Sequence, residues 1–281
     1  MGRGLRELRS IRLIDLSVPI SSRTAEPDPP HIDYIDHRRA ATELATIATH
    51  ILRQSLSPSQ QPGAVITEDA FEGGLGLANE NLRLDTHSGT HMDAPWHFGP
   101  LSENRPAKTI DQIPLEWCFG PGVVLDLRFK KPGDLIAPQD LKAALDRIGY
   151  TVEPRDIVLI MTGADKHFNQ SDYFSAHAGM GREATKWLLD QGIKVMGIDG
   201  WGFDRPADLM LADYWRTKDR ASLLPAHMLG RDREYCHMEK MANLDQIPVP
   251  YGFWVSCFPI KVERGSAGWI RAVALVEDGH P

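Results

Sequence analysis

Three histidines and one aspartate within a short stretch of the chain could together bind a divalent metal ion. They are His87, His91, Asp93 and His97, in the sequence from Asp85 to Phe98. Neutral imidazole nitrogens and carboxylate oxygens suit Zn(II), Mn(II) or Fe(II). No cysteine lies among them, which argues against a closed structural zinc site. We therefore expect an open site, in which one coordination position admits water or substrate.

The spacing of these four residues predicts how the backbone must run. All four positions are odd-numbered, so an extended chain would point every side chain to one face. Gly89 and Pro95 disfavour a helix over this stretch. A straight strand would separate His87 from Asp93 by roughly 20 Å, which is too far for ligands of one ion. The chain must therefore bend, and Gly89 is the residue best able to allow it.

The stretch from His87 to Phe98 closely resembles the His-x-Gly-Thr-His-x-Asp-x-Pro-x-His signature of the cyclase family. That family includes bacterial kynurenine formamidases, isatin hydrolases and certain aromatic-polyketide cyclases. The resemblance covers most of the chain, through Leu13–Ser17, Asp156–Gly163, Gly197–Asp199, Pro225–His227 and Arg271–Ala274. It implies an α/β protein with the swivelling β/β/α fold, a mixed sheet with flanking helices, and usually a homo-oligomer, a dimer or a tetramer.

The resemblance also implies roles for individual residues. In formamidase-like members the first metal is held by the residues that match His87, His91 and Asp93, and the last histidine, here His97, donates and accepts protons. A distal histidine and a glutamate twelve residues later complete a second metal position in dinuclear members. This chain supplies His227 and Glu239 at that separation, and His237 competes as a ligand. We expect one or two ions of Zn or Mn per chain.

The ligand set points to hydrolysis, and the resemblance implies that the bond cleaved is an amide, as in arylformamidases, or a lactone of a small, aromatic substrate. A metal ion lowers the pKa of bound water and polarises the carbonyl, and a histidine such as His97 can move the proton. No serine nucleophile is needed, and Thr90 is expected to support His91 by hydrogen bonding. Two alternatives stay open: a ring-closing cyclase that acts on an aromatic polyketide, and a non-catalytic metal-stabilised binding protein.

Substrate contacts are harder to assign. The aromatic side chains Trp96, Trp201 and Phe203 are the candidates, since each could line a pocket for a planar substrate. Asp204 and Arg205 could orient the substrate, but surface pairing is the role we expect of them. Formamidase-like members carry a tryptophan in the early loop where this chain has Thr24 and Ala25, which weakens the case for kynurenine-type specificity. In contrast, the stretches 230–236 and 268–269 are more similar to the polyketide-cyclase branch.

Short apolar runs that alternate with helical patterns predict the elements that position these residues. The apolar runs are mostly continuous, which is typical of strands that are covered on both faces. Leu141 and Leu145 share one face of one predicted helix, and Ala184 and Leu188 share a face of the other. The predicted strands are Ile11–Leu16, Gly122–Leu127, Ile157–Met161, Lys194–Ile198, Phe253–Val255 and Ile270–Val276, and the predicted helices are Pro138–Arg147 and Arg182–Gln191.

Two segments interrupt this α/β order. Residues 22–63 contain a proline-rich start and an amphipathic helix around Leu44 to Ile51, so we expect a lid-like excursion within one catalytic domain that spans residues 1–281. A second excursion covers residues 203–224. Whether the first covers its own site or that of a neighbouring subunit is left open by the sequence.

Composition excludes several other classes of function. The chain has 281 residues, a formal net charge of −7 and 42% hydrophobic residues, as expected for a soluble globular protein. Its charges are of mixed sign, so we expect no nucleic-acid partner, and it lacks the long apolar run of a membrane span. The start, Met1 to Arg12, lacks the apolar stretch of a signal peptide, which predicts a cytoplasmic location. Three widely spaced cysteines, Cys118, Cys236 and Cys257, are expected to be buried thiols.

Overall fold

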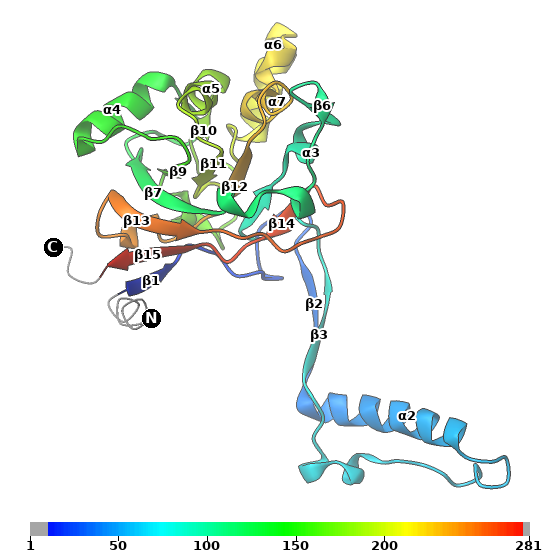
Figure 1. The fold of residues 1–281 in the computed structure, drawn as a ribbon. Helices are drawn as coiled ribbons and strands as arrows, with labels where there is room; N and C mark the ends of the chain where they lie inside the picture. Colours follow the sequence, from blue (N-terminus) through cyan, green and yellow to red (C-terminus); the bar gives the residue numbers. More distant parts are fainter. Residues whose placement is uncertain (1–10, 278–281) are drawn as a thin grey trace. The chain divides into compact units, whose positions relative to one another are not determined.

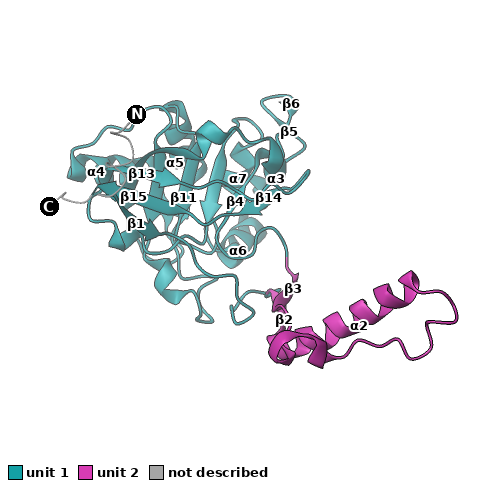
Figure 2. Cartoon of the chain, turned by 60° about the horizontal axis from the view of Figure 1, so that its bottom comes forward, with its two compact units in different colours: residues 1–29, 85–281 teal, residues 30–84 magenta. Residues whose placement is uncertain are grey.

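The computed structural model describes residues 11–277 and divides the chain into two compact units (Figure 2). The main unit combines residues up to 29 with those from 85 onward, and the small unit covers residues 30–84. The excursion expected over residues 22–63 therefore differs from the small unit at both ends. Most of the basic start, Met1 to Arg12, lies outside the described residues.

A mixed nine-stranded sheet forms the centre of the main unit (Figure 1). Its four central strands, from β7 to β12, run parallel, and the flanking strands pair antiparallel. The α/β class with a mixed sheet is therefore confirmed. In sheet order the strands are β1 (Ile11–Asp15), β15 (Val273–Glu277), β13 (Tyr251–Ser256), β7 (Phe119–Asp126), β9 (Ile157–Met161), β11 (Val195–Ile198), β12 (Cys236–Glu239), β4 (His91–Asp93) and β14 (Ala267–Trp269).

Strand β9 explains why the apolar runs are continuous. Its five residues are all buried, and they alternate between two hydrophobic clusters, one on each face of the sheet. Ile160 faces the cluster that also holds Leu141 of α4 (Pro138–Ile148) and Leu188 of α5 (Arg182–Asp190), so these helices cover that face. Leu159 faces the other cluster, which includes Ile14 and Phe253. Neither face of β9 meets water, and the strand needs no polar residue.

The predicted strands and helices of the main unit are found with small differences at their ends. The largest differences are of three residues: β7 begins at Phe119 instead of Gly122, and the last strand begins at Val273 instead of Ile270. The backbone before it makes other contacts: Ile270 N–H donates to the Thr90 carbonyl, and the Ala272 carbonyl accepts from Leu16 N–H. The second excursion contains a helix, α6 (Ala207–Thr217).

The remaining elements are short and lie mainly in loops of the main unit. Two of them carry residues of the predicted site, α3 and α7. They are α3 (Pro95–Phe98), α7 (Pro225–Leu229), β5 (Leu101–Ser102), β6 (Arg105–Pro106), β8 (Leu135–Ile136) and β10 (Gly179–Met180), with 3-10 turns at Ile110–Gln112, Leu115–Trp117, Ala164–His167, Arg220–Ser222 and Leu244–Gln246.

The small unit is an antiparallel strand pair, β2 (His31–Ile35) and β3 (Asn79–Arg83), with the helix α2 (His37–Ser55) between them. Two 3-10 turns, Glu68–Ala70 and Glu72–Gly74, follow the helix. The Asp36 carboxylate caps α2 by accepting from two backbone N–H groups of its first turn. The amphipathic helix expected within the first excursion is thus confirmed, and it extends further in both directions.

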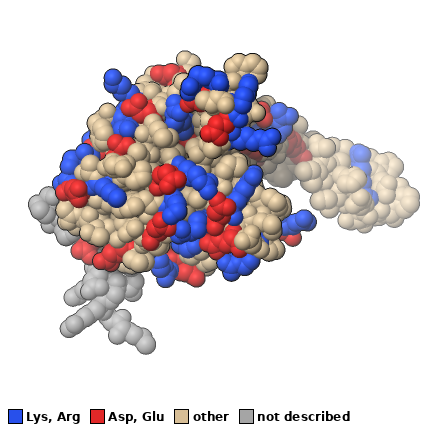
Figure 3. Space-filling model, turned by 90° about the horizontal axis from the view of Figure 1, so that it is seen from above, with Lys and Arg blue, Asp and Glu red and all other residues tan. Residues whose placement is uncertain are grey.

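The surface and the thiols fit a folded globular protein. Lysines and arginines are interspersed with aspartates and glutamates on the face of the main unit seen in Figure 3. None of the helices within residues 11–277 is long and apolar enough to cross a membrane. Cys118, Cys236 and Cys257 are all buried and free, as expected, and burial raises the pKa of the Cys118 thiol to about 12.

The two-sided burial of β9 predicts a large cost for removing its side chains. Leu159→Ala should lower the free energy of unfolding by about 2 to 5 kcal/mol, because Leu159 is fully buried and leaves a cavity. Leu13→Ala is the matched control, since 66% of Leu13 is exposed on β1, and it should change that free energy by less than about 0.5 kcal/mol. Urea unfolding measures both values, and equal effects would contradict this packing.

Candidate metal centre

Gly89 turns the chain between the first two histidines of the motif. Its φ of +61° lies in the left-handed region, which glycine adopts without strain, so the bend expected there is confirmed. The Asp85 carboxylate holds the turn by accepting from the His87 backbone N–H at 2.8 Å. As a result, His87 Nδ1 lies 2.9 Å from Asp93 Oδ1.

His91 and Asp93 project from strand β4, whereas His97 comes from the short helix α3 that follows. The extended conformation expected as far as His97 is therefore wrong for that residue. Pro95 occupies the first turn of α3, where its fixed φ and missing N–H favour a helix start. The turn brings His97 Nε2 to 3.7 Å from Asp93 Oδ2.

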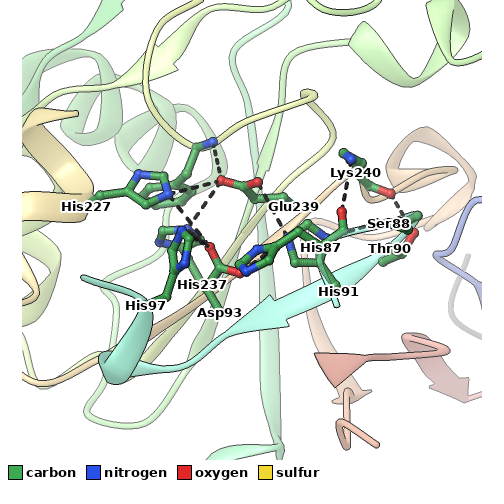
Figure 4. A network of polar contacts seen from close by, with 12 residues as sticks. His87, Ser88, Thr90, His91, Asp93, His97, His227, His237, Glu239 and Lys240 are labelled. Atoms are coloured by element: carbon green, nitrogen blue, oxygen red, sulfur yellow. Dashed lines mark hydrogen bonds and ion pairs between the residues drawn. The ribbon is translucent and has the colours of Figure 1, made fainter. Parts of the chain in front are cut away.

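The pairing of β4 with β12 brings the distal residues to the motif. In this antiparallel register His91 lies opposite Glu239, and Asp93 lies opposite His237. His237 Nε2 is 3.1 Å from Asp93 Oδ2 and 3.3 Å from Glu239 Oε1. His227, on α7, points Nε2 at the same two carboxylates, 3.7 Å from Asp93 Oδ2 and 3.6 Å from Glu239 Oε1 (Figure 4).

Second partners fix which ring nitrogen of each histidine faces the cluster. His91 Nδ1 is 2.9 Å from the Gly89 carbonyl, and His227 Nδ1 is 2.5 Å from Asp204 Oδ2. Carbonyl and carboxylate oxygens accept hydrogen bonds, so each Nδ1 carries the proton. Each Nε2 is then the ring nitrogen that faces the carboxylates and would bind a metal there, which is how metal-bound histidines are usually held.

Two buried atoms of the motif test whether the residues fit a metal ion. His91 Nε2 and Asp93 Oδ1 are fully buried, and within the described part of the chain neither makes a hydrogen bond of good geometry, although His87 Nδ1 lies 2.9 Å from Asp93 Oδ1. An unpaired buried polar atom is costly and calls for an explanation. The two atoms lie 3.2 Å apart, close to the ~3.3 Å expected between neighbouring ligands of a tetrahedral ion with bonds of about 2 Å. The donor set therefore fits a divalent metal.

The charges of the cluster favour the same conclusion. Burial by itself would raise the pKa of Asp93, but the surrounding histidines, His91 first, hold it well below its usual range. Glu239 is similar: burial opposes ionisation, yet His237 and His227 keep its pKa lowered. Both side chains are therefore carboxylates near neutral pH. Burial, with a smaller contribution from His87 and His227, lowers the pKa of His97 to about 4, so its ring is neutral.

A cavity of about 370 Å³ adjoins the cluster. His87, His97, His227 and Glu239 form part of its wall, so three ligand candidates and the proton-transfer candidate His97 border open space. Of the aromatic residues expected to contact substrate, Trp201 and Phe203 line this cavity. Trp96 is outside its lining and is 44% exposed.

Several residues around the site were not assigned by sequence reasoning. Asp204 was expected to form surface pairs, which is wrong, because its buried carboxylate accepts from His227 Nδ1 and from two backbone N–H groups. Lys240 is also buried, and its ammonium donates to Glu26 Oε1 at 2.5 Å and to the His87 carbonyl at 3.0 Å. Its position directly after Glu239 was the only signal in the sequence.

Thr90 supports the site as expected. Its hydroxyl accepts from the Val18 backbone N–H at 2.8 Å and donates to the Lys240 carbonyl at 2.5 Å. The hydroxyl therefore ties the start of β4 to the end of β12, next to His91 and Glu239.

The bond between Asp204 and His227 predicts an effect on metal affinity. In Asp204→Asn the amide can donate to His227 Nδ1, which would move the ring proton to Nε2 and remove the lone pair that faces the cluster. We expect zinc affinity, measured by competition with a chelator, to fall about tenfold to a hundredfold. Asp213→Asn is the control, since Asp213 pairs with Arg205 and Arg216 instead. Unchanged zinc affinity in a folded Asp204→Asn protein would contradict this role.

Comparison with known proteins gives a consistent set of relatives. A family model described as "Putative cyclase" matches residues 14–205. The isatin hydrolase of Roseibium aggregatum is 28% identical over 203 residues, which cover 69% of this chain and 73% of the relative. The kynurenine formamidase of Salinibacter ruber is 28% identical over 206 residues, which cover 73% and 82%.

Solved structures share the fold over almost the whole chain. An isatin hydrolase bound to the product analogue thioisatinate has a TM-score of 0.70 and 22% identity, with 98% of this chain and 97% of that chain covered. Isatin hydrolase A from Ralstonia solanacearum gives a TM-score of 0.71 and 23% identity, with 98% and 95% covered. At these identities the likeness shows the fold alone, and it agrees with the fold class expected from the sequence.

Proposed function

The chain belongs to the cyclase family, and we propose that it is a metal-dependent hydrolase that cleaves an amide or lactone bond of a small aromatic substrate, with water as the nucleophile. The observation that carries this proposal is the cavity wall, since three ligand candidates, His87, His227 and Glu239, and the proton-transfer candidate His97 border a space large enough for a small substrate. The hydrolases among its relatives support the same reaction class.

We propose His87, His91 and Asp93 as ligands of a first ion, and His227 and Glu239, with His237, as ligands of a second. The two oxygens of Asp93 support this division. Oδ1 faces His87 and His91, whereas Oδ2 faces His237 and His227. Zinc or manganese fits these nitrogen and oxygen donors. When bound, such an ion lowers the pKa of water and polarises the substrate carbonyl.

His97 is the residue we propose for proton transfer. It lines the cavity, and its lowered pKa leaves the ring neutral, so Nε2 can take a proton from the attacking water. The same nitrogen can then deliver the proton to the departing amine or alkoxide. General acid and base catalysis of this kind typically contributes about 10² to 10⁴ in rate.

We further propose that the main unit and the small unit together form one catalytic domain, and that the protein is a cytoplasmic homo-oligomer. Of the first excursion, Glu26 and Asp28 line the cavity, which supports a role in covering the site. The small unit exposes apolar side chains, Ile51 and Leu77 among them, as a surface used by a second copy would. Buried free thiols suit a reducing compartment.

The metal assignment predicts how many ions are bound. Wild-type protein supplied with zinc or manganese should hold two equivalents by plasma mass spectrometry. His227→Ala should hold one, because it loses a ligand of the second position only. His91→Ala should lose the first ion. A single equivalent in wild type would mean that His227, Glu239 and His237 only support the first ion. Wild type that stays metal-free would refute the proposal.

The reaction itself can be tested with isatin and with a simple aryl formamide such as formanilide. Hydrolysis adds one water, so mass spectrometry distinguishes it from the ring-closing alternative, in which water is lost or the mass is unchanged. His97→Ala should lower kcat by about 10² to 10⁴. His167→Ala is the control, because His167 pairs with Asp172 and does not line the cavity. Full activity in His97→Ala would exclude this residue as the proton carrier.

A further inference from the structure

Only four buried side-chain nitrogen or oxygen atoms within residues 11–277 lack a hydrogen-bond partner, and all four belong to the site. Two are His91 Nε2 and Asp93 Oδ1, which the metal explains. The other two, His177 Nε2 and Trp201 Nε1, belong to residues that line the cavity and are not in the metal cluster. Because unpaired buried groups are rare, the second pair also needs a partner.

His177 offers a hydrogen-bond acceptor. Its side chain is 1% exposed, and Nδ1 lies 3.2 Å from the Ala178 carbonyl, which can only accept. The proton is therefore on Nδ1, and Nε2 carries a lone pair. Burial lowers the pKa of this histidine, which keeps the ring neutral. Gly200 makes room for the ring, because a Cβ there would lie 2.8 Å from His177 Cγ.

Trp201 offers a hydrogen-bond donor, since an indole N–H can only donate. Neighbours hold its ring in place: the ring centre of Phe174 is 4.5 Å away, and the Lys240 ammonium lies 5.1 Å from the indole centre. Glu26 and the His87 carbonyl in turn fix Lys240. These contacts fix the position of the Trp201 indole at the cavity.

We propose that His177 and Trp201 recognise two polar groups of the substrate that lie at or next to the bond that is cleaved, one a hydrogen-bond donor and the other an oxygen acceptor. An N–H or O–H group donates to His177 Nε2, and a carbonyl or carboxyl oxygen accepts from Trp201 Nε1. The inference rests on the proposed hydrolase function and narrows its substrate class. A molecule without one of these groups leaves a buried partner unpaired, which is how a polar pocket rejects close analogues.

Isatin is a suitable probe, because it has a ring N–H and a second carbonyl next to the one that is hydrolysed. N-methylisatin lacks the donor, and oxindole lacks the second carbonyl. Binding of all three to the full-length, zinc-loaded His97→Asn protein can be measured by calorimetry without turnover. We expect isatin to bind about tenfold or more tightly than either analogue.

Second substitutions in this background assign each contact. His177→Phe should abolish the preference for isatin over N-methylisatin and keep the preference over oxindole, and Trp201→Phe should do the opposite. General damage to the pocket would not give this crossed pattern. Trp254→Phe is the matched control, because Trp254 is 47% exposed, stacks on Phe119 and does not line the cavity. It should leave all three affinities unchanged.

Nuclear magnetic resonance gives an independent readout. The indole N–H signal of Trp201, identified by its loss in Trp201→Phe, should move downfield with isatin and stay in place with oxindole. Equal weakening of all three ligands in both variants, or no binding at millimolar isatin, would overturn the inference. If wild type hydrolyses isatin or formanilide while the variants keep both preferences, the hydrolase function stands and this recognition is wrong. If the crossed pattern appears but neither compound is hydrolysed, His177 and Trp201 recognise the ligand as proposed and the hydrolase function is wrong.

Discussion

The register between β4 and β12 is the constraint on which the candidate site depends. Antiparallel pairing sets Asp93 opposite His237 and His91 opposite Glu239, so residues that are far apart in the sequence present ligand atoms within 3.1 to 3.6 Å of one another. A slip of one residue would turn these side chains to the other face of the sheet. The Thr90 hydroxyl, which bonds Val18 and Lys240, helps to hold this register at the end where the ligands lie.

This register creates an electrostatic demand that shapes the surroundings. Two buried carboxylates, Asp93 and Glu239, lie around the same histidines, and within residues 11–277 no lysine or arginine is paired with either. Histidine nitrogens and a divalent cation are what remain to compensate them. Atoms outside the cluster orient those nitrogens: the Gly89 carbonyl orients His91, and the Asp204 carboxylate orients His227. The outer contacts of the cluster therefore fit a metal ion as well as its candidate ligand atoms do.

Local sequence patterns predicted the parts of this arrangement that depend on local forces. The bend at Gly89 follows from its conformational freedom, and the buried β9 follows from a continuous apolar run. Pairing between distant segments leaves no such local trace, so β12 and its register were not predicted, and His237 could be named only as a competing ligand. The family resemblance supplied Glu239. Asp204 was misjudged because Asp204 and Arg205 are neighbours in sequence, whereas each bonds to a different distant group.

The ligand candidates and the pair His177 and Trp201 line the same cavity but come from different parts of the fold. The two groups can therefore change independently. The ligand candidates lie on or beside β4, α7 and β12, whose pairing and burial leave little freedom. His177 and Trp201 lie in loops between elements, where substitution disturbs the sheet less. Loop changes could thus alter which polar groups a substrate must carry while the metal-binding frame stays intact.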